Sequence, residues 1–217
     1  MGPMERRERD RLALRRKILD AGRRLFAEQG YEAVTMRTIA HEIEYSPRTI
    51  YLHFKDKDDL IRELCRQDFH AFGTEMAKLA GIADPIERLR AAGKGYAAFA
   101  QQFPNHYQLM FMTRKPVVDR PEDLEWHDDP EADAYAFVRA CLSEAHDKGM
   151  LRTGWSDPDL AAQVVWAALH GVLALHITHR EDPFIPWAAL DARVDGMIRL
   201  IVSGLRAEPP PVAPKKS

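Results

Sequence analysis

The sequence is poor in cysteine and has no long apolar run, and each shortage excludes a class of protein. Its two cysteines, Cys65 and Cys141, stand far apart and outside any CxxC spacing, which argues against a disulfide framework or a zinc site. No segment has the 18 consecutive apolar residues of a typical membrane span, and the arginine-rich start lacks the apolar stretch of a signal peptide. We therefore expect a cytoplasmic protein with no membrane partner.

Common enzyme motifs are also missing. The chain has nine histidines and many carboxylates, but no HExxH, GxSxG, P-loop or GxGxxG. His176 and His179 stand three apart and would share a helix face, which leaves a metal site open as an alternative. We otherwise expect no catalytic residues, no metal and no cofactor.

The 217 residues instead carry helical patterns almost from end to end. With 46% hydrophobic residues the chain can bury a core, and neither an internal repeat nor an alternating β-branched run indicates a sheet. The fold class expected is all-α. The proline-rich and acidic segment 113–130 is expected to be a loop, and the proline-rich tail 208–217 is expected to be disordered.

Residues 35–54 predict two short helices joined by a tight turn. Thr35 can cap the first helix, while Ser46 can cap the second, with Pro47 at its first position. In the second helix Ile50 and Phe54 lie four apart and would face inward. This pattern is a helix-turn-helix, whose second helix touches DNA. The side chains left outside are those of Arg48, Thr49, Tyr51, Leu52 and His53.

This segment resembles the DNA-binding domain of the TetR (TetR/AcrR) family of bacterial transcriptional regulators, and residues 18–31 are similar to that family's first helix and its glycine stop. The resemblance implies an N-terminal three-helix DNA-binding domain with a basic arm at 1–57 and a helical regulatory and dimerisation domain at 58–207. Two residues depart from the motif. Glu44 replaces the usual turn glycine, at a cost of roughly 1 kcal/mol if its backbone is left-handed, and Arg48 replaces a small residue. The matching positions are Thr35, Ile39, Ala40, Ser46, Thr49, Tyr51, Phe54, Lys57 and Leu60.

Charge supports a DNA-binding N-terminal part. Residues 1–57 carry 13 Lys and Arg against 9 Asp and Glu, whereas the remainder carries 18 against 24. Beside a helix-turn-helix, the basic residues suit phosphate neutralisation. Because acidic residues are interleaved, a solvated helix face is the alternative. The run comprises Arg6, Arg7, Arg9, Arg11, Arg15, Arg16, Lys17, Arg23 and Arg24.

The predicted DNA-binding residues divide by role. Arg48 is expected to read a base edge, such as that of guanine, and Thr49 to contact a base or a phosphate. A merely polar surface is the alternative for Arg37 and Lys57. The residues assigned mainly to phosphates are Tyr51, His53, Lys57, Thr35 and Arg37, and the capping residues Ser46 and Pro47 complete the set.

Two C-terminal segments, 157–179 and 187–206, predict helices that are apolar over more than one face, so each needs cover on two sides. The resemblance implies that a second copy supplies this cover in a four-helix bundle, which makes the protein a homodimer. Residues 166–171 are similar to the Trp…His-Gly signature of one C-terminal subclass. His170 then serves mainly as a structural or interface hydrogen-bonding group.

The resemblance also implies a small-molecule effector in the C-terminal part. Most aromatic stripes are simply core, and this remains the alternative for each residue named. The function expected is that of a repressor that binds a palindromic DNA operator as a homodimer and is released by a partly hydrophobic ligand. A ligand- or metal-dependent activator, an enzyme and a nonspecific DNA-binding protein are the alternatives. The candidate ligand-binding residues are Phe99, Phe103, Tyr107, Met110, Phe111, Tyr135, Phe137, Trp166 and His170.

Overall fold

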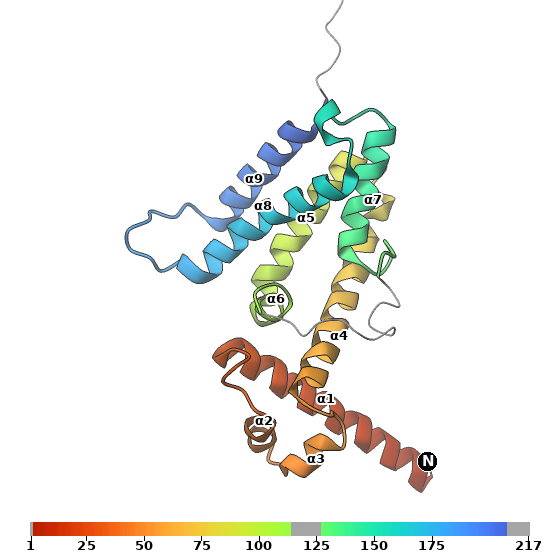
Figure 1. The fold of residues 1–217 in the computed structure, drawn as a ribbon, viewed down its shortest axis with the longest axis vertical. Coiled ribbons are helices and arrows are strands. Elements are labelled where there is room, and N and C mark those ends of the chain that lie inside the picture. Colours follow the sequence, from red (N-terminus) through yellow and green to blue (C-terminus); the bar gives the residue numbers. More distant parts are fainter. Residues whose placement is uncertain (1, 114–126, 208–217) are drawn as a thin grey trace, which may run out of the picture. The chain divides into compact units, whose positions relative to one another are not determined.

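The computed structural model describes residues 2–113 and 127–207, and Figure 1 shows their ribbon. Regular structure in these ranges is helical, apart from an isolated bridge between Leu151 and Arg206. The prediction of an all-α fold is therefore confirmed. The tail expected at 208–217 and most of the loop expected at 113–130 lie outside the described residues.

The chain packs as two compact units, and each is described by itself. One is drawn from the ranges Met1–Phe72 and Phe99–Trp126, the other from Gly73–Ala98 and His127–Ser217. The helices α4 (Lys57–Ala77) and α5 (Pro85–Gln102) contribute to both. The two units are defined by which residues contact one another and do not correspond to domains along the sequence. The domain boundary expected between residues 57 and 58, at the start of α4, therefore stays a prediction.

The first unit contains α1 (Pro3–Gln29), α2 (Met36–Glu42), α3 (Pro47–Tyr51), the start of α4 and α6 (Pro104–Phe111). In Figure 1, α2 and α3 lie on the same side of α1. Gly22 allows α1 to approach α4 closely, because a Cβ atom there would lie 2.9 Å from Leu60 Cδ2. The largest side chains buried in this helix-turn-helix core include those of Phe26, Ile39, Ile50, Phe54, Leu60 and Ile61.

Local hydrogen bonds fix where the short helices begin. The hydroxyl of Thr35 accepts from the backbone N–H of Thr38 at 3.1 Å, and that of Ser46 accepts from the N–H of Thr49 at 3.2 Å. Between the two helices Glu44 has φ +60°, in the left-handed region. Both predicted caps and the strained turn at Glu44 are therefore confirmed.

The second unit contains the rest of α4 and α5, the short 3₁₀ helices η1 (Lys78–Gly81) and η3 (Thr153–Trp155), and α7 (Ala134–Asp147), α8 (Pro158–His179) and α9 (Leu190–Leu205). Asp157 caps α8, where its carboxylate accepts hydrogen bonds from two backbone N–H groups. The last helix, expected from residue 187, begins only at Leu190. The indole N–H of Trp187 instead donates to the carbonyl oxygen of His179, which holds the chain in a loop.

Helix α8 is exceptionally apolar. Within the described ranges it is the helix whose length and composition would suffice to cross a membrane. A helix that packs in a core or against a second subunit has the same composition. Leu160, Val164 and Leu175 of α8 are 44–49% exposed, so part of this apolar surface lacks cover within the single chain.

Candidate nucleic-acid interface

The second helix of the helix-turn-helix, α3, has one buried face and one open face. Ile50 and Phe54 are buried at 0% and 1% exposure, whereas Tyr51 and Leu52 are 53% and 78% exposed. Arg48 is also exposed. The division between inward and outward side chains predicted from the sequence is therefore confirmed, and an open face on a capped helix is the geometry that reads a DNA groove.

Two of the predicted DNA-binding cations are available for a partner. Arg48 on α3 and Arg37 on α2 are exposed, and neither forms a hydrogen bond or ion pair with any residue in the described ranges. The hydroxyls are more occupied. Thr49 Oγ1 lies 2.8 Å from Ser46 Oγ, and Thr35 Oγ1 lies 2.9 Å from Thr38 Oγ1. The hydroxyls of Thr35 and Thr49 therefore already take part in the helix caps, in addition to any contact with DNA.

Lys57 has a structural partner that the sequence does not reveal. Its Nζ donates to the carbonyl oxygen of Tyr31 at 2.8 Å and lies 4.0 Å from the centre of the Tyr31 ring. The Tyr31 hydroxyl donates to the carboxylate of Asp58, and burial together with that hydrogen bond raises the pKa of Tyr31. Lys57 thus ties the start of α4 to the turn after α1.

His53 is half-buried at the end of the reading helix. Burial lowers the pKa of His53, and the positive charges of Arg11 and Arg15 lower it further. The lowered pKa disfavours the charged imidazolium. His53 is therefore poorly suited to hold a phosphate through charge.

Some side chains of the arginine-rich run bind other parts of the protein, and others are exposed and unpaired within the described residues. The sequence alone does not distinguish the two groups. Arg15 donates to the carbonyl oxygen of His53 at 3.0 Å and lies over the Phe54 ring, and Lys17 donates to the carbonyl oxygen of Ile43 at 3.1 Å. Arg24 pairs with Glu42 of α2. These cations clamp α1 onto the helix-turn-helix, so they are not all available to phosphates.

A buried carboxylate joins three helices of the first unit. Asp68 on α4 is 5% exposed and accepts two hydrogen bonds from Arg23 on α1, at 2.9 and 3.2 Å. His106 on α6 places its Nδ1 3.2 Å from the same carboxylate. No pattern in the sequence points to this cluster, because its members lie tens of residues apart.

Five of the predicted ligand-binding residues belong to the first unit and pack on one another. Tyr107 and Met110 are fully buried, whereas Phe103 is 40% exposed. Ring centres lie 5.0 Å apart for Tyr107 and Phe111 and 5.6 Å apart for Phe99 and Phe103. Such mutual packing is typical of core.

The other four candidates belong to the second unit, where three of them surround a polar contact. The indole N–H of Trp166 donates to the Tyr96 hydroxyl at 3.1 Å, and His170 Nδ1 lies 3.3 Å from the same oxygen. Tyr135 meets the Trp166 ring edge-on, with centres 6.4 Å apart, while Phe137 is buried. Sequence reasoning counts Tyr96 only as an apolar residue and misses its place between Trp166 and His170.

Comparisons with known proteins agree with this geometry. Residues 18–64 match the family model described as "Bacterial regulatory proteins, tetR family", and residues 89–203 match "Tetracyclin repressor-like, C-terminal domain". The chain is 28% identical to the HTH-type transcriptional repressor AcnR of Corynebacterium glutamicum over 191 residues, covering 86% of this chain and 88% of that protein.

Two solved structures share the fold. FadR of Bacillus subtilis in complex with stearoyl-CoA is 20% identical with a TM-score of 0.71, covering 87% of this chain and 97% of that one. The triclosan complex of SmeT, the repressor of a Stenotrophomonas maltophilia multidrug efflux pump, is 22% identical with a TM-score of 0.67, covering 94% and 99%. At such identities the likeness concerns the fold alone, and the Trp…His-Gly subclass stays a prediction.

Proposed function

Because this chain belongs to the TetR family of bacterial regulatory proteins, we propose that it represses transcription as a homodimer on a palindromic operator and that a small, partly hydrophobic molecule releases it. The observation that carries this function is the open face of α3, presented on a helix whose opposite face is buried. AcnR of Corynebacterium glutamicum, a relative that matches 86% of this chain, is named a transcriptional repressor.

We assign recognition of the DNA bases first to Arg48. A guanidinium donates two parallel hydrogen bonds to the O6 and N7 atoms of guanine, and one good pair of this kind discriminates by about 1 to 3 kcal/mol. Arg48 is exposed and unpaired within the described residues, so no internal hydrogen bond must break before it reads a base. Arg37 and Tyr51, exposed on either side of the turn, are assigned to phosphates, which position the reader without specifying sequence.

Selection of binding sites from a random duplex pool tests this assignment. The wild-type protein should enrich an inverted repeat whose half-site centres lie about one helical turn, or a multiple of it, apart. Arg48→Ala should lose preference at one symmetric pair of bases and keep the rest of the motif. Lys78→Ala, an exposed change on η1, is the matched control and should return the wild-type motif. Failure to enrich any repeat from the folded dimer would contradict the proposed function.

Dimerisation is assigned to α8 and α9. Leu160, Val164 and Leu175 on α8 and Leu200 on α9 are large apolar side chains between 44% and 70% exposed. A second copy that packs against these helices would remove this surface from water. Sedimentation of Val164→Glu should show a monomer at concentrations where the wild-type protein is dimeric. A dimer of unchanged affinity would place the interface elsewhere.

The effector proposal rests on the aromatic residues of the second unit. Trp166, Tyr96 and His170 combine ring surface with polar atoms, a lining that suits a partly hydrophobic molecule with one or two polar groups. The named complexes of FadR and SmeT hold stearoyl-CoA and triclosan, so these two compounds are suitable first probes. Release of operator DNA by either compound, weakened in Trp166→Ala, would support the assignment. Release that is unaffected by this change would exclude Trp166 from the site.

A further inference from the structure

The N-terminal half of α1 extends beyond the packed helix-turn-helix. The helix begins at Pro3, but the first residue described as buried is Ile18. Residues 4–13 are all exposed, including Met4 at 83% and Leu12 at 52%. The match to the family's DNA-binding model begins only at residue 18. Residues 3–17, called the extension below, therefore precede the matched domain, and their last residues, among them Arg15 and Lys17, contact the helix-turn-helix.

The extension carries an excess of positive charge that its own acids do not neutralise. It has seven Lys and Arg against three Asp and Glu, and two of the seven, Arg15 and Lys17, already bind carbonyl oxygens of the helix-turn-helix. Glu8 is held by two hydrogen bonds from Arg11, and Asp10 lies 3.4 Å from Arg9. The exposed cationic side chains that form no hydrogen bond or ion pair with any described residue are those of Arg6, Arg7 and Arg16.

Residue spacing aligns the extension with the helix-turn-helix. Arg7, Arg11 and Arg15 follow one another four apart, and Ile18 comes three later, so they share the α1 face that packs on the core. Arg15 reaches the carbonyl oxygen of His53 at the end of α3. In Figure 1, α1 runs on past α3 towards the N-terminus. The α1 face that carries Arg7, Arg11 and Arg15 therefore continues beyond the folded core next to the end of α3.

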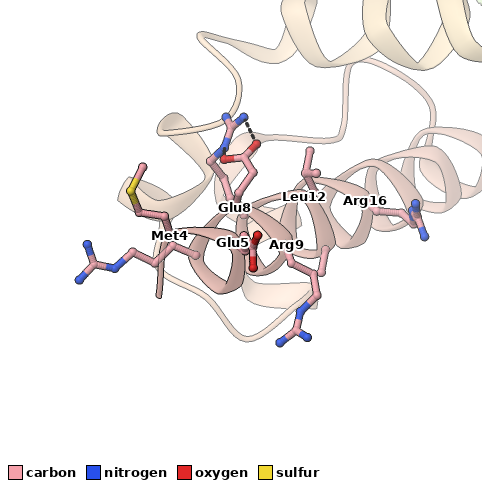
Figure 2. A pocket seen from close by; sticks show the side chains of 9 residues that line it. Met4, Glu5, Glu8, Arg9, Leu12 and Arg16 are labelled. Atoms are coloured by element: carbon pink, nitrogen blue, oxygen red, sulfur yellow. Dashed lines mark hydrogen bonds and ion pairs between the residues drawn. The ribbon is translucent and has the colours of Figure 1, made fainter. Parts of the chain in front are cut away.

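The surface of the extension is unsuited to enclosing a small molecule. Figure 2 shows a hollow whose lining side chains all come from α1, so no other described part of the chain closes it. In that view Glu8, which is held by a guanidinium, and Arg9 point to different sides of the helix. A second copy of the same basic helix would be repelled. A long polyanion that runs past the end of α3 is the partner with complementary charge.

We propose that residues 3–17 form a second DNA-binding element that holds phosphates flanking the bases read by α3. The inference rests on the proposed function and extends its interface outward. At about 1.5 Å per residue the extension is roughly 22 Å long, which corresponds to about six base pairs at roughly 3.4 Å each. Arg7 is its leading phosphate-binding residue, since it lies on the α1 face shared with Arg15 and its side chain is exposed and unpaired within the described part of the chain.

Duplex length provides the test. The full chain is titrated against a short duplex that ends at the selected operator and a long duplex with about ten further base pairs, roughly one helical turn, on each side. The variant R6Q/R7Q/R16Q removes three charges while keeping good helix formers. The matched control K78Q/K94Q/K148Q removes three exposed charges from the second unit, outside α8 and α9.

The wild-type protein and the control should bind the long duplex about tenfold or more tightly than the short one. The triple variant should lose that gain, keep its affinity for the short duplex, and show a salt slope on the long duplex that is shallower by about 0.9 for each phosphate that it no longer neutralises. Equal wild-type affinities for the two duplexes, or equal losses of the variant on both, would overturn the inference alone. If the folded wild-type protein bound neither duplex in preference to random DNA, the proposed function and the inference would fail together.

Discussion

Lys57 and Tyr31 are joined twice, by a hydrogen bond of 2.8 Å from the ammonium to the tyrosine carbonyl oxygen and by the ammonium's position over the ring. Tyr31 also packs on Phe26, with ring centres 5.9 Å apart. The contact therefore anchors the start of α4 to the end of α1. A residue expected to bind phosphate is thus part of the scaffold that sets the reading helix in place.

Lys57→Ala should lower the free energy of unfolding by about 1 to 2 kcal/mol, the sum expected for one hydrogen bond and one cation–π contact. Denaturant unfolding measures this change. Lys55→Ala, which removes an exposed lysine two residues earlier, should leave stability within about 0.5 kcal/mol. If the two variants are equally stable, the contacts of Lys57 with Tyr31 add little to the stability of the fold, and the predicted phosphate contact of Lys57 is unaffected.

Glu44→Gly should stabilise the protein by up to about 1 kcal/mol. The turn holds Glu44 at φ +60°, a conformation that costs a side chain with a Cβ atom but not glycine. Thermal unfolding should show a higher Tm for Glu44→Gly and no gain for Glu44→Ala, which keeps the Cβ atom. A gain in both variants would point to removal of the carboxylate rather than to the backbone.

Asp68→Ala should destabilise the protein by about 3 kcal/mol, because it leaves the largely buried guanidinium of Arg23 without its main partner. Asp20 pairs with the same guanidinium at 3.2 Å, but its side chain is 65% exposed. Asp20→Ala should therefore cost well under about 1 kcal/mol. Equal effects of the two changes, measured by denaturant unfolding, would show that burial does not govern this cluster.

Stability should fall in alkaline solution through Cys141. Burial raises the pKa of the Cys141 thiol to about 11, from an ordinary value of 9.0. A raised pKa in the folded state means that the stabilisation is complete below about pH 9 and is lost as pH rises towards 11, by roughly 1 kcal/mol per pH unit. The difference in unfolding free energy between wild type and Cys141→Ala should shrink over this window. A constant difference would contradict the raised pKa.

The same thiol should be unreactive at neutral pH. Cys141 is 1% exposed and stays protonated in the folded state, since burial raises its pKa, and the thiolate is the reactive form. Iodoacetamide near neutral pH should label Cys141 only after denaturation, as followed by peptide mass spectrometry. Rapid labelling of the native protein would show that this part of the core opens readily.

The sequence predicts those features that depend on neighbours along the chain. Thr35, Ser46 and Pro47 mark helix starts because a cap acts on backbone groups two or three residues away. Spacing alone places Ile50 and Phe54 inside, and both are buried. The error at the start of α9 has a nonlocal cause, since Trp187 is held by the carbonyl oxygen of His179.

By itself, then, the sequence determined the all-α class, the helix-turn-helix with its strained turn at Glu44, and the exposed position of Arg48, because each follows from interactions within one or two helical turns. Only the tertiary structure decided which cations remain open to DNA. Arg15, Lys17 and Arg23 meet partners 26 to 45 residues away, and composition does not encode such pairings. Arg7 stays open because the helix that carries it runs past the core, where no group of the described residues pairs with its side chain, and Arg16 stays open because it lies on the opposite face of α1.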